Sequence, residues 1–214
     1  RSTLFPYTTL FRSQPLRKRP PRITMLGNHG VIVSGATVEE IDERVHFLTA
    51  SIRAAIERAA ADMEEQCLRV ASHFKGATGA AAVAIAADET TRSDSERDAG
   101  PVAHGPLIPD QIVYAGSLPL LLDRNDTEEV VGAKTALYRA QHGRLPIVAV
   151  IPAAAVIARG DSQGGADNAL AVFLDALRVA REAGLLGEVR VMDEEERRRS
   201  EEHTSELQSP TSIS

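Results

Sequence analysis

The chain has 214 residues, of which 43% are apolar, 25% charged and 4% aromatic, and its formal net charge is −6. This length and apolar content suffice for one globular domain or two small ones. The acidic balance argues against a nucleic-acid partner, and no apolar run approaches the ~20 residues of a membrane-spanning helix. Cys67 is the one cysteine, which excludes an intramolecular disulfide, so we expect a cytoplasmic protein without a membrane partner.

Both ends of the sequence resemble translated sequencing adapters. Residues 3–13 read TLFPYTTLFRS and residues 199–209 read RSEEHTSELQS, which is the order expected for a pair of short-read adapters around an insert. We therefore interpret 1–13 and 199–214 as adapter artefacts and leave them out of the fold prediction. A natural amphipathic tail is the alternative interpretation.

The first predicted unit covers residues 14–75 and begins with two strands. The short apolar runs at 23–26 and 31–33 flank the sequence Gly-Asn-His-Gly at 27–30, which predicts two strands with a tight connection. Gly35 is expected to end the second strand.

A long helix is predicted next. Thr37 and Glu40 have the spacing of a capping box, so we expect the helix to begin at about Val38 and to run to about Ser72. Its apolar residues recur at steps of three and four, which predicts a stripe facing the core. These residues are Ile41, Val45, Leu48, Ile52, Ile56, Ala59 and Met63.

Residues 76–100 are rich in Ala, Gly, Thr, Ser and charges and are predicted to link two units, with one short strand at 82–85. The second predicted unit, 101–198, contains three further strands and two helices. The strands are expected at 111–114, 147–151 and 156–158. The first helix is expected at 126–141, ended by Gly143, with an apolar face formed by Val130, Val131, Ala133, Leu137 and Ala140.

The second helix of this unit is expected to begin at Ser162 and to stop at Gly184. Its predicted apolar face comprises Ala166, Leu170, Phe173, Leu174, Leu177 and Ala180. The charged run 193–198 is interpreted as the start of a solvated helix. The predicted fold class is therefore α/β.

Two segments of the chain share one pattern at an offset of 125 residues, which places Ile23 over Val148 and Thr37 over Ser162. The same offset places His29 opposite Ala154. Either a structural repeat or chance apolar patterning can produce this similarity. If the pattern contains a site, the polar turn of the first copy is where we expect it.

His29 is the first candidate for a metal ligand. It sits between glycines in a short turn, and imidazole is the commonest metal ligand in proteins. Zinc, however, takes three or four protein ligands, and the sequence has no H-x-H or H-x-x-x-H nearby. Spacing alone therefore favours a structural turn histidine over a ligand.

The segment 23–43, ITMLGNHGVIVSGATVEEIDE, closely resembles the stretch L-x-N-H-G-x-x-x-x-G-x-(S/T)-x-x-E-A of the class II aldolase/adducin family. The resemblance implies a metal-dependent lyase that cleaves a ketose 1-phosphate to glycerone phosphate and an aldehyde. In that family the histidine of N-H-G binds the catalytic divalent metal, usually zinc, and the matching residue is His29. Asn28 and Gly30 would shape the turn that aims it. Ile41 stands where the family often has alanine.

The second half resembles an extension found in longer relatives, among them aldolases fused to a short-chain dehydrogenase. A G-P-L-T-P-D-H-like segment there corresponds to 104–111, HGPLIPDQ, and a P-x-V-x-V-x-P-G-x-G-x-F-x-x-G strand to 146–160. The turn glycines are replaced by alanines, and Gln111 stands where histidine is common. His104 and Asp110 are secondary candidate site residues, with a solvent-facing loop as the alternative for His104.

The resemblance also implies what the chain lacks. The other metal ligands of the family, its acidic residue and its phosphate-binding loop precede the N-H-G motif, where this sequence has only residues 14–22 and an adapter-like segment. We therefore expect the chain to be a fragment. It would consist of a class II aldolase-like layer of sheet and helix followed by a second small α/β unit, and it would bind zinc weakly and be inactive alone.

The full-length protein implied by the resemblance would take a phosphosugar substrate and form a homo-oligomer. In the metal-dependent reaction the metal acts as a Lewis acid on the substrate oxygens and a carboxylate handles the proton. An adducin-like scaffold without catalysis is the main alternative. A nucleotide-binding α/β protein is less favoured because no glycine-rich phosphate loop follows a strand.

Overall fold

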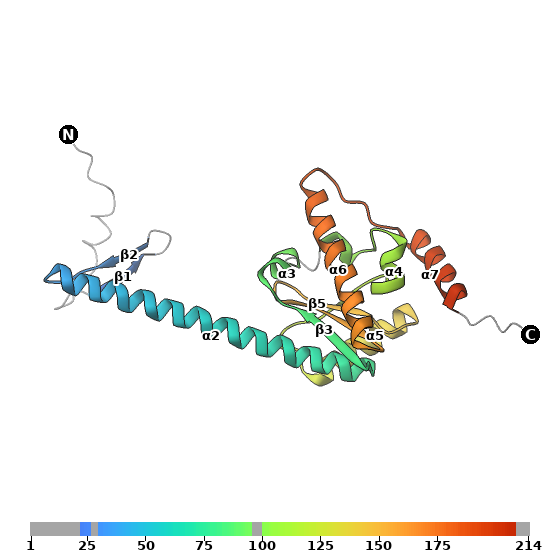
Figure 1. Ribbon diagram of the computed structural model, residues 1–214, viewed down its shortest axis with the longest axis horizontal. Coiled ribbons are helices and arrows are strands. Elements are labelled where there is room, and N and C mark those ends of the chain that lie inside the picture. Colours follow the sequence, from blue (N-terminus) through green and yellow to red (C-terminus); the bar gives the residue numbers. More distant parts are fainter. Residues whose placement is uncertain (1–21, 27–29, 96–99, 209–214) are drawn as a thin grey trace, which may run out of the picture. The chain divides into compact units, whose positions relative to one another are not determined.

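The computed structural model describes residues 22–26, 30–95 and 100–208, and for 204–208 only the backbone (Figure 1). The fold is mixed α/β, as predicted. The chain divides into two units, Arg1–Ala59 and Ala60–Ser214. Among the described helices, none combines the length and the apolar character needed to cross a lipid bilayer.

The first described elements form a β-hairpin, which confirms the two predicted strands. Strand β1 (Ile23–Leu26) pairs antiparallel with β2 (Gly30–Val33), and Leu26 lies opposite Gly30. This register leaves residues 27–29 as the connection between the paired positions. The connection itself, with Asn28 and His29, lies outside the described residues.

Helix α2 (Val38–Thr78) begins where the capping residues predict. The Glu40 backbone N–H donates to Thr37 Oγ1 at 3.2 Å, and the Glu40 carboxylate accepts from the Ala36 N–H at 2.9 Å. The helix ends six residues later than predicted. Phe74 and Thr78 are buried in the last turns, and Gly79 follows with φ +64°, so tertiary packing carries the helix past Ser72.

The predicted burial of the apolar stripe on α2 is wrong for most of its members. Ile41, Val45, Ile52 and Ile56 are 36%, 41%, 43% and 64% exposed. Spacing predicts which residues share a helix face, but burial also needs a second surface. Within residues 22–59 the structure describes only the hairpin and the first part of this helix.

The second unit contains a mixed sheet with strand order β3-β6-β5-β4. Its strands are β3 (Ala82–Ala86), β4 (Leu120–Leu121), β5 (Val148–Ile151) and β6 (Ala155–Gly160). β5 and β6 form an antiparallel hairpin, β3 adds antiparallel to β6, and β4 adds parallel to β5. The crossover from β4 to β5 passes through helix α5 (Glu128–His142), so these elements form a βαβ unit.

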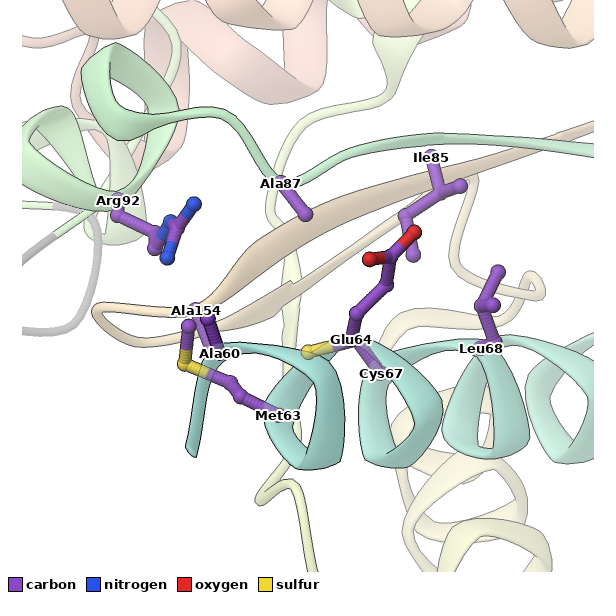
Figure 2. Close-up of a pocket in the computed structure, with 9 residues that line it drawn as sticks. All are labelled: Ala60, Met63, Glu64, Cys67, Leu68, Ile85, Ala87, Arg92 and Ala154. Atoms are coloured by element: carbon purple, nitrogen blue, oxygen red, sulfur yellow. The ribbon is translucent and has the colours of Figure 1, made fainter. Parts of the chain in front are cut away.

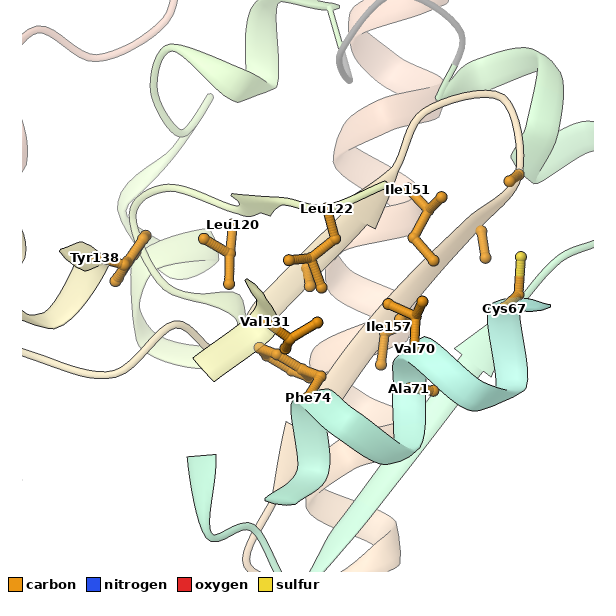
Figure 3. Close-up of a cluster of buried hydrophobic side chains, with 13 residues drawn as sticks. Cys67, Val70, Ala71, Phe74, Leu120, Leu122, Val131, Tyr138, Ile151 and Ile157 are labelled. Atoms are coloured by element: carbon orange, nitrogen blue, oxygen red, sulfur yellow. The ribbon is translucent and has the colours of Figure 1, made fainter. Parts of the chain in front are cut away.

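Apolar clusters cover both faces of this sheet. Val148, Val150, Val156 and Ala158 pack with helix α6 (Gln163–Gly184), while the alternate residues of β5 and β6 pack with α5 and the end of α2 (Figures 1 and 3). The second cluster includes Cys67, Val70, Ala71, Phe74, Leu120, Val131, Tyr138, Ala149, Ile151 and Ile157. Burial on both faces explains why β5 and β6 are apolar almost throughout.

Helices α5 and α6 confirm the predicted segments. Ser162 Oγ accepts from the Gly165 N–H at 3.1 Å at the start of α6, and Gly143, with φ +71°, ends α5. The predicted face of α5 is rotated, however. Val131, Thr135 and Tyr138 are buried, whereas Leu137 is 58% exposed. The aromatic ring of Tyr138 supplies apolar surface, which a prediction based on aliphatic residues alone does not include.

The strand predicted at 111–114 is wrong, because these residues belong to helix α4 (Pro109–Ala115). Pro109 occupies the first turn, where a missing N–H costs nothing, and Gly116, with φ +81°, ends the helix. Gln111, Ile112 and Ala115 are buried at helical spacing. Pro109 and Gly116, which bound the segment, therefore determine its helical structure, and the β-branched residues between them do not.

The segment 76–100 contains regular structure where a linker was predicted. It includes the end of α2, strand β3, which confirms the short strand at 82–85, and helix α3 (Glu89–Asp94). β3 pairs with β6 over five residue pairs, from Ala82 opposite Gly160 to Ala86 opposite Val156. The division between the two units lies instead between Ala59 and Ala60.

The remaining elements are a 3-10 helix, η1 (Gly100–Ala103), and helix α7 (Glu194–Gln208), which confirms the helix start predicted at 193–198. The Glu196 N–H donates to Asp193 Oδ1 at 2.9 Å. α7 continues into the adapter-like residues, where the Glu201 carboxylate accepts from the Ser117 hydroxyl and pairs with Arg144.

The two segments related by the offset of 125 residues have the same local structure. Ile23 opposite Val33 and Leu26 opposite Gly30 correspond to Val148 opposite Ala158 and Ile151 opposite Ala155. Helices α2 and α6 begin at corresponding residues, after the corresponding caps Thr37 and Ser162. Agreement in register, cap and helix start favours a structural repeat over chance apolar patterning.

Candidate functional site

The first predicted site is the β1–β2 turn. Gly30, the described residue of the candidate turn, is the first residue of β2, is exposed and has φ +110°. A residue with a Cβ rarely adopts this backbone conformation, which explains the glycine after His29. His29 and Asn28 lie outside the described residues, so their role as metal ligand and turn residue stays a prediction.

The predicted divalent metal needs further ligands. Among the described residues there is no group of three or more His, Cys, Asp or Glu side chains arranged to hold a metal ion. The described part of the chain therefore does not supply a complete zinc site by itself.

His104 and Asp110, the secondary candidates, lie in the second unit. His104 follows η1, is exposed, and its backbone N–H donates to Pro101 O at 3.0 Å. Asp110 is exposed in the first turn of α4, at the rim of an apolar cavity of about 370 Å³ between α4 and α6. His104 is not part of that cavity's lining.

Gln111, noted only as a departure from the family motif, is a buried polar residue beside the same cavity. Its Oε1 accepts from the Leu107 N–H at 3.0 Å, and its Nε2 has no hydrogen-bond partner among the described residues. A buried amide with one unused donor is costly. The sequence signal that could have found it is the pair Pro109 and Gly116, which bounds a helix and places Gln111 at helical spacing with the buried Ala115.

Two cavities that the sequence did not predict flank the β5–β6 turn, residues 152–154. The first, of about 350 Å³, is lined by α2, β3 and α3 and contains Cys67, Glu64 and Arg92 (Figure 2). The second, of about 530 Å³, lies where the parallel strands β4 and β5 end and contains Arg124. Ala154 lines both cavities.

The groups around the first cavity affect the Cys67 thiol. Cys67 is 1% exposed, and burial raises the pKa of its thiol, while the positive charges of Arg124 and Arg92 act in the opposite direction. The thiol is therefore held neutral, and Cys67 lacks the low pKa of a nucleophilic cysteine.

Tyr138 and His142 mark a third polar region, between α5 and α7. Burial raises the pKa of Tyr138 to about 12, and its hydroxyl donates to Leu118 O at 2.7 Å. Burial, followed by the charge of Arg197, lowers the pKa of His142. A position at the end of α5 would favour a charged histidine, but desolvation outweighs the helix dipole at this site.

Comparison of the chain with protein-family models, with curated proteins and with solved structures finds no match.

Proposed function

We propose that residues 22–59 are the hairpin-and-helix segment of a class II aldolase-like lyase. The proposed reaction cleaves a ketose 1-phosphate to glycerone phosphate and an aldehyde. His29 serves as one ligand of a divalent metal, zinc in the first instance. The bound metal would supply Lewis-acid stabilisation of the negative charge that develops on oxygen.

The observation that supports this proposal is the local geometry around the N-H-G motif. Leu26 lies opposite Gly30, and a capped helix begins eight residues after Gly30. The paired strands on either side of the motif and the capped helix after it agree with the resemblance, and this agreement supports the proposal. Asn28 and Gly30 contribute by shaping the turn.

The remaining ligands must come from residues outside the described ones. We therefore expect the 214-residue chain to lose zinc on dialysis and to cleave no sugar phosphate. Zinc retained at one equivalent, measured by elemental analysis, would contradict the assignment of His29 as an isolated ligand. Measurable cleavage of a ketose 1-phosphate would contradict it equally.

A segment exchange tests the role of His29 directly. Residues 22–43 replace the corresponding N-H-G segment of an established class II aldolase, and zinc content and aldol cleavage are measured. We expect the chimera to retain both properties and His29→Ala within it to reduce kcat/KM by at least about 100-fold. His46→Ala in a second chimera, extended to residue 50, is the matched control, because His46 lies on the exposed surface of α2.

Two results of this exchange count against the lyase. The first is full activity of the His29→Ala chimera. The second is a chimera whose circular dichroism shows a native fold but which neither binds zinc nor cleaves substrate.

A second candidate function is a non-catalytic scaffold of the adducin type. The observation that favours it is the exposed apolar stripe of α2, where Ile52 and Ile56 are 43% and 64% exposed. Exposed apolar patches of this kind mark interaction surfaces. A chimera that folds but lacks activity, together with a partner bound through this stripe, would favour the scaffold over the lyase.

A further inference from the structure

The β5–β6 turn occupies a position where α/β proteins commonly bind ligands. β4 and β5 are parallel, and their carboxyl ends lead into the loop after Leu121 and into the turn 152–154. In open α/β sheets, ligands bind in the crevice outside the carboxyl ends of parallel strands. The cavity of about 530 Å³ lies at this edge.

Arginine side chains line both cavities beside this turn. Arg92 enters the first cavity from α3 (Figure 2), and Arg124 lines the second from the loop after β4. Both guanidinium charges act to lower the pKa of the Cys67 thiol, which lines the first cavity. Within the described residues neither arginine forms an ion pair, and the one side-chain hydrogen bond of the two runs from Arg92 Nε to Asp88 O at 3.4 Å.

The carboxylates around the second cavity are already engaged. Asp123 Oδ1 accepts from the Asn125 N–H at 2.8 Å. Asp126 Oδ2 accepts from the Asp123 N–H at 2.8 Å and pairs with Lys134 at 2.6 Å. These contacts fix the loop and leave the Arg124 guanidinium as the group available to a ligand.

The backbone of the turn is held in an unusual conformation. Ala153 has φ +54° and is the non-glycine residue with positive φ in the described part of the chain. Such a conformation is unfavourable for alanine and concentrates at functional sites. The turn also corresponds, at the offset of 125 residues, to the turn that carries His29.

We infer that the second unit has an anion-binding site at the β5–β6 turn, 152–154, with Arg92 and Arg124 as the residues that attract a phosphate-bearing small molecule. Arginine suits this task because its planar guanidinium donates paired hydrogen bonds to phosphate oxygens. The lining of the second cavity includes Arg124 and Lys134 against one carboxylate, Asp123, whereas the first cavity has Arg92 against Glu64, and this difference places the anionic group nearer to Arg124. The site does not depend on the lyase proposed for the first unit.

Inorganic phosphate and acetate are the probes for this site, titrated into the 214-residue chain at pH 8 and followed by ¹H–¹⁵N spectra. We expect saturable shifts at the amides of residues 153–155 and at the side-chain N–H groups of both arginines. Phosphate, largely a dianion at this pH, should bind more tightly than acetate, because two positive charges act on it. The readout does not involve aldol cleavage, so failure here is distinguishable from failure of the proposed function.

Substitutions locate the binding. Arg92→Gln and Arg124→Gln should each weaken phosphate binding by at least about threefold, and the double variant by at least about tenfold. Arg139→Gln on α5 and Arg178→Gln on α6 are matched controls, since both remove one exposed positive charge outside the cavities. Thermal melts of all variants show that the fold is retained.

Three results would overturn the inference. These are shifts that grow linearly with phosphate concentration, equal binding of acetate and phosphate, and phosphate binding that neither Arg92→Gln nor Arg124→Gln weakens. An equal loss of phosphate affinity in Arg139→Gln and Arg178→Gln would also overturn it, because the binding would then depend only on the net charge of the protein.

Discussion

The segments 23–59 and 148–184 share strand register, helix cap and helix start, yet their surroundings differ. In the second, α6 packs on β5 and β6, and Phe173 is 1% exposed. In the first, the corresponding helix face, which includes Ile41 and Ile52, remains largely exposed. Local sequence is therefore sufficient for the hairpin and the capped helix, while burial of the helix depends on further elements, which for α6 are β3, α4 and η1.

The largest expected difference between the copies comes from their core positions. Phe173→Ala should lower the free energy of unfolding of the second unit by about 3–5 kcal/mol, because it leaves a cavity in a packed cluster. Its counterpart Leu48→Ala, at a half-buried position, should cost about 1 kcal/mol or less. Urea denaturation measures both. Similar losses would show that the first helix is packed as tightly as the second.

Corresponding glycines provide the second test. A Cβ at Gly160 would clash with Ala166 N and lie 2.8 Å from Ser162 O, both of them backbone atoms. Gly160→Ala should therefore cost about 1–3 kcal/mol. At Gly35 the nearest atoms belong to side chains, Arg44 Nη1 and Ile41 Cγ1, both at 2.9 Å. Gly35→Ala should cost less than about 1 kcal/mol in the same assay.

Removal of the two helix caps should affect different measurable properties of the chain. Thr37→Ala and Ser162→Ala each remove one acceptor for an N–H of the first turn, at a cost of about 1 kcal/mol. Because the first turn of α6 is packed through Ala166, Ser162→Ala should lower the melting temperature of the second unit. Thr37→Ala should instead speed amide exchange in the first turns of α2, measured by hydrogen exchange. A global melting shift from Thr37→Ala would contradict this difference.

The smallest expected effect is a pH dependence confined to the second unit. The pKa of His142 is lowered in the folded protein, so the unfolded chain binds a proton first as the pH falls. The contribution to stability is complete above about pH 6.5 and is lost as the pH falls from there toward the folded pKa. His142→Gln should flatten this part of the stability curve, measured by urea denaturation between pH 5 and 8 (about the range of histidine titration).

An unchanged slope in His142→Gln would mean that another group titrates. Tyr138, whose ring centroid lies 4.4 Å from that of His142, loses a contact in this variant, so the slope rather than the absolute stability is the informative quantity.

Features set by neighbouring residues could be predicted from the sequence. Thr37 and Ser162 marked the helix starts, Gly143 marked a helix end, and the runs at 23–26 and 148–151 marked strands. The strand predicted at 111–114 failed because Pro109 and Gly116 outweigh β-propensity. Burial of the α2 stripe failed because amphipathic spacing describes one surface and says nothing of a second.

The candidate sites divide in the same way. His29 was found through a local motif and remains a prediction. Arg92 and Arg124 line the two cavities beside one turn because β3 and β4 join the β5–β6 hairpin from opposite edges. No local pattern links two arginines that are brought to one turn by a sheet.

Ala154 contributes to the walls of both cavities beside the β5–β6 turn. The size of residue 154 therefore affects two volumes at once. A larger side chain at this position would reduce both cavities, so a single substitution would change which ligands fit on either side of the turn.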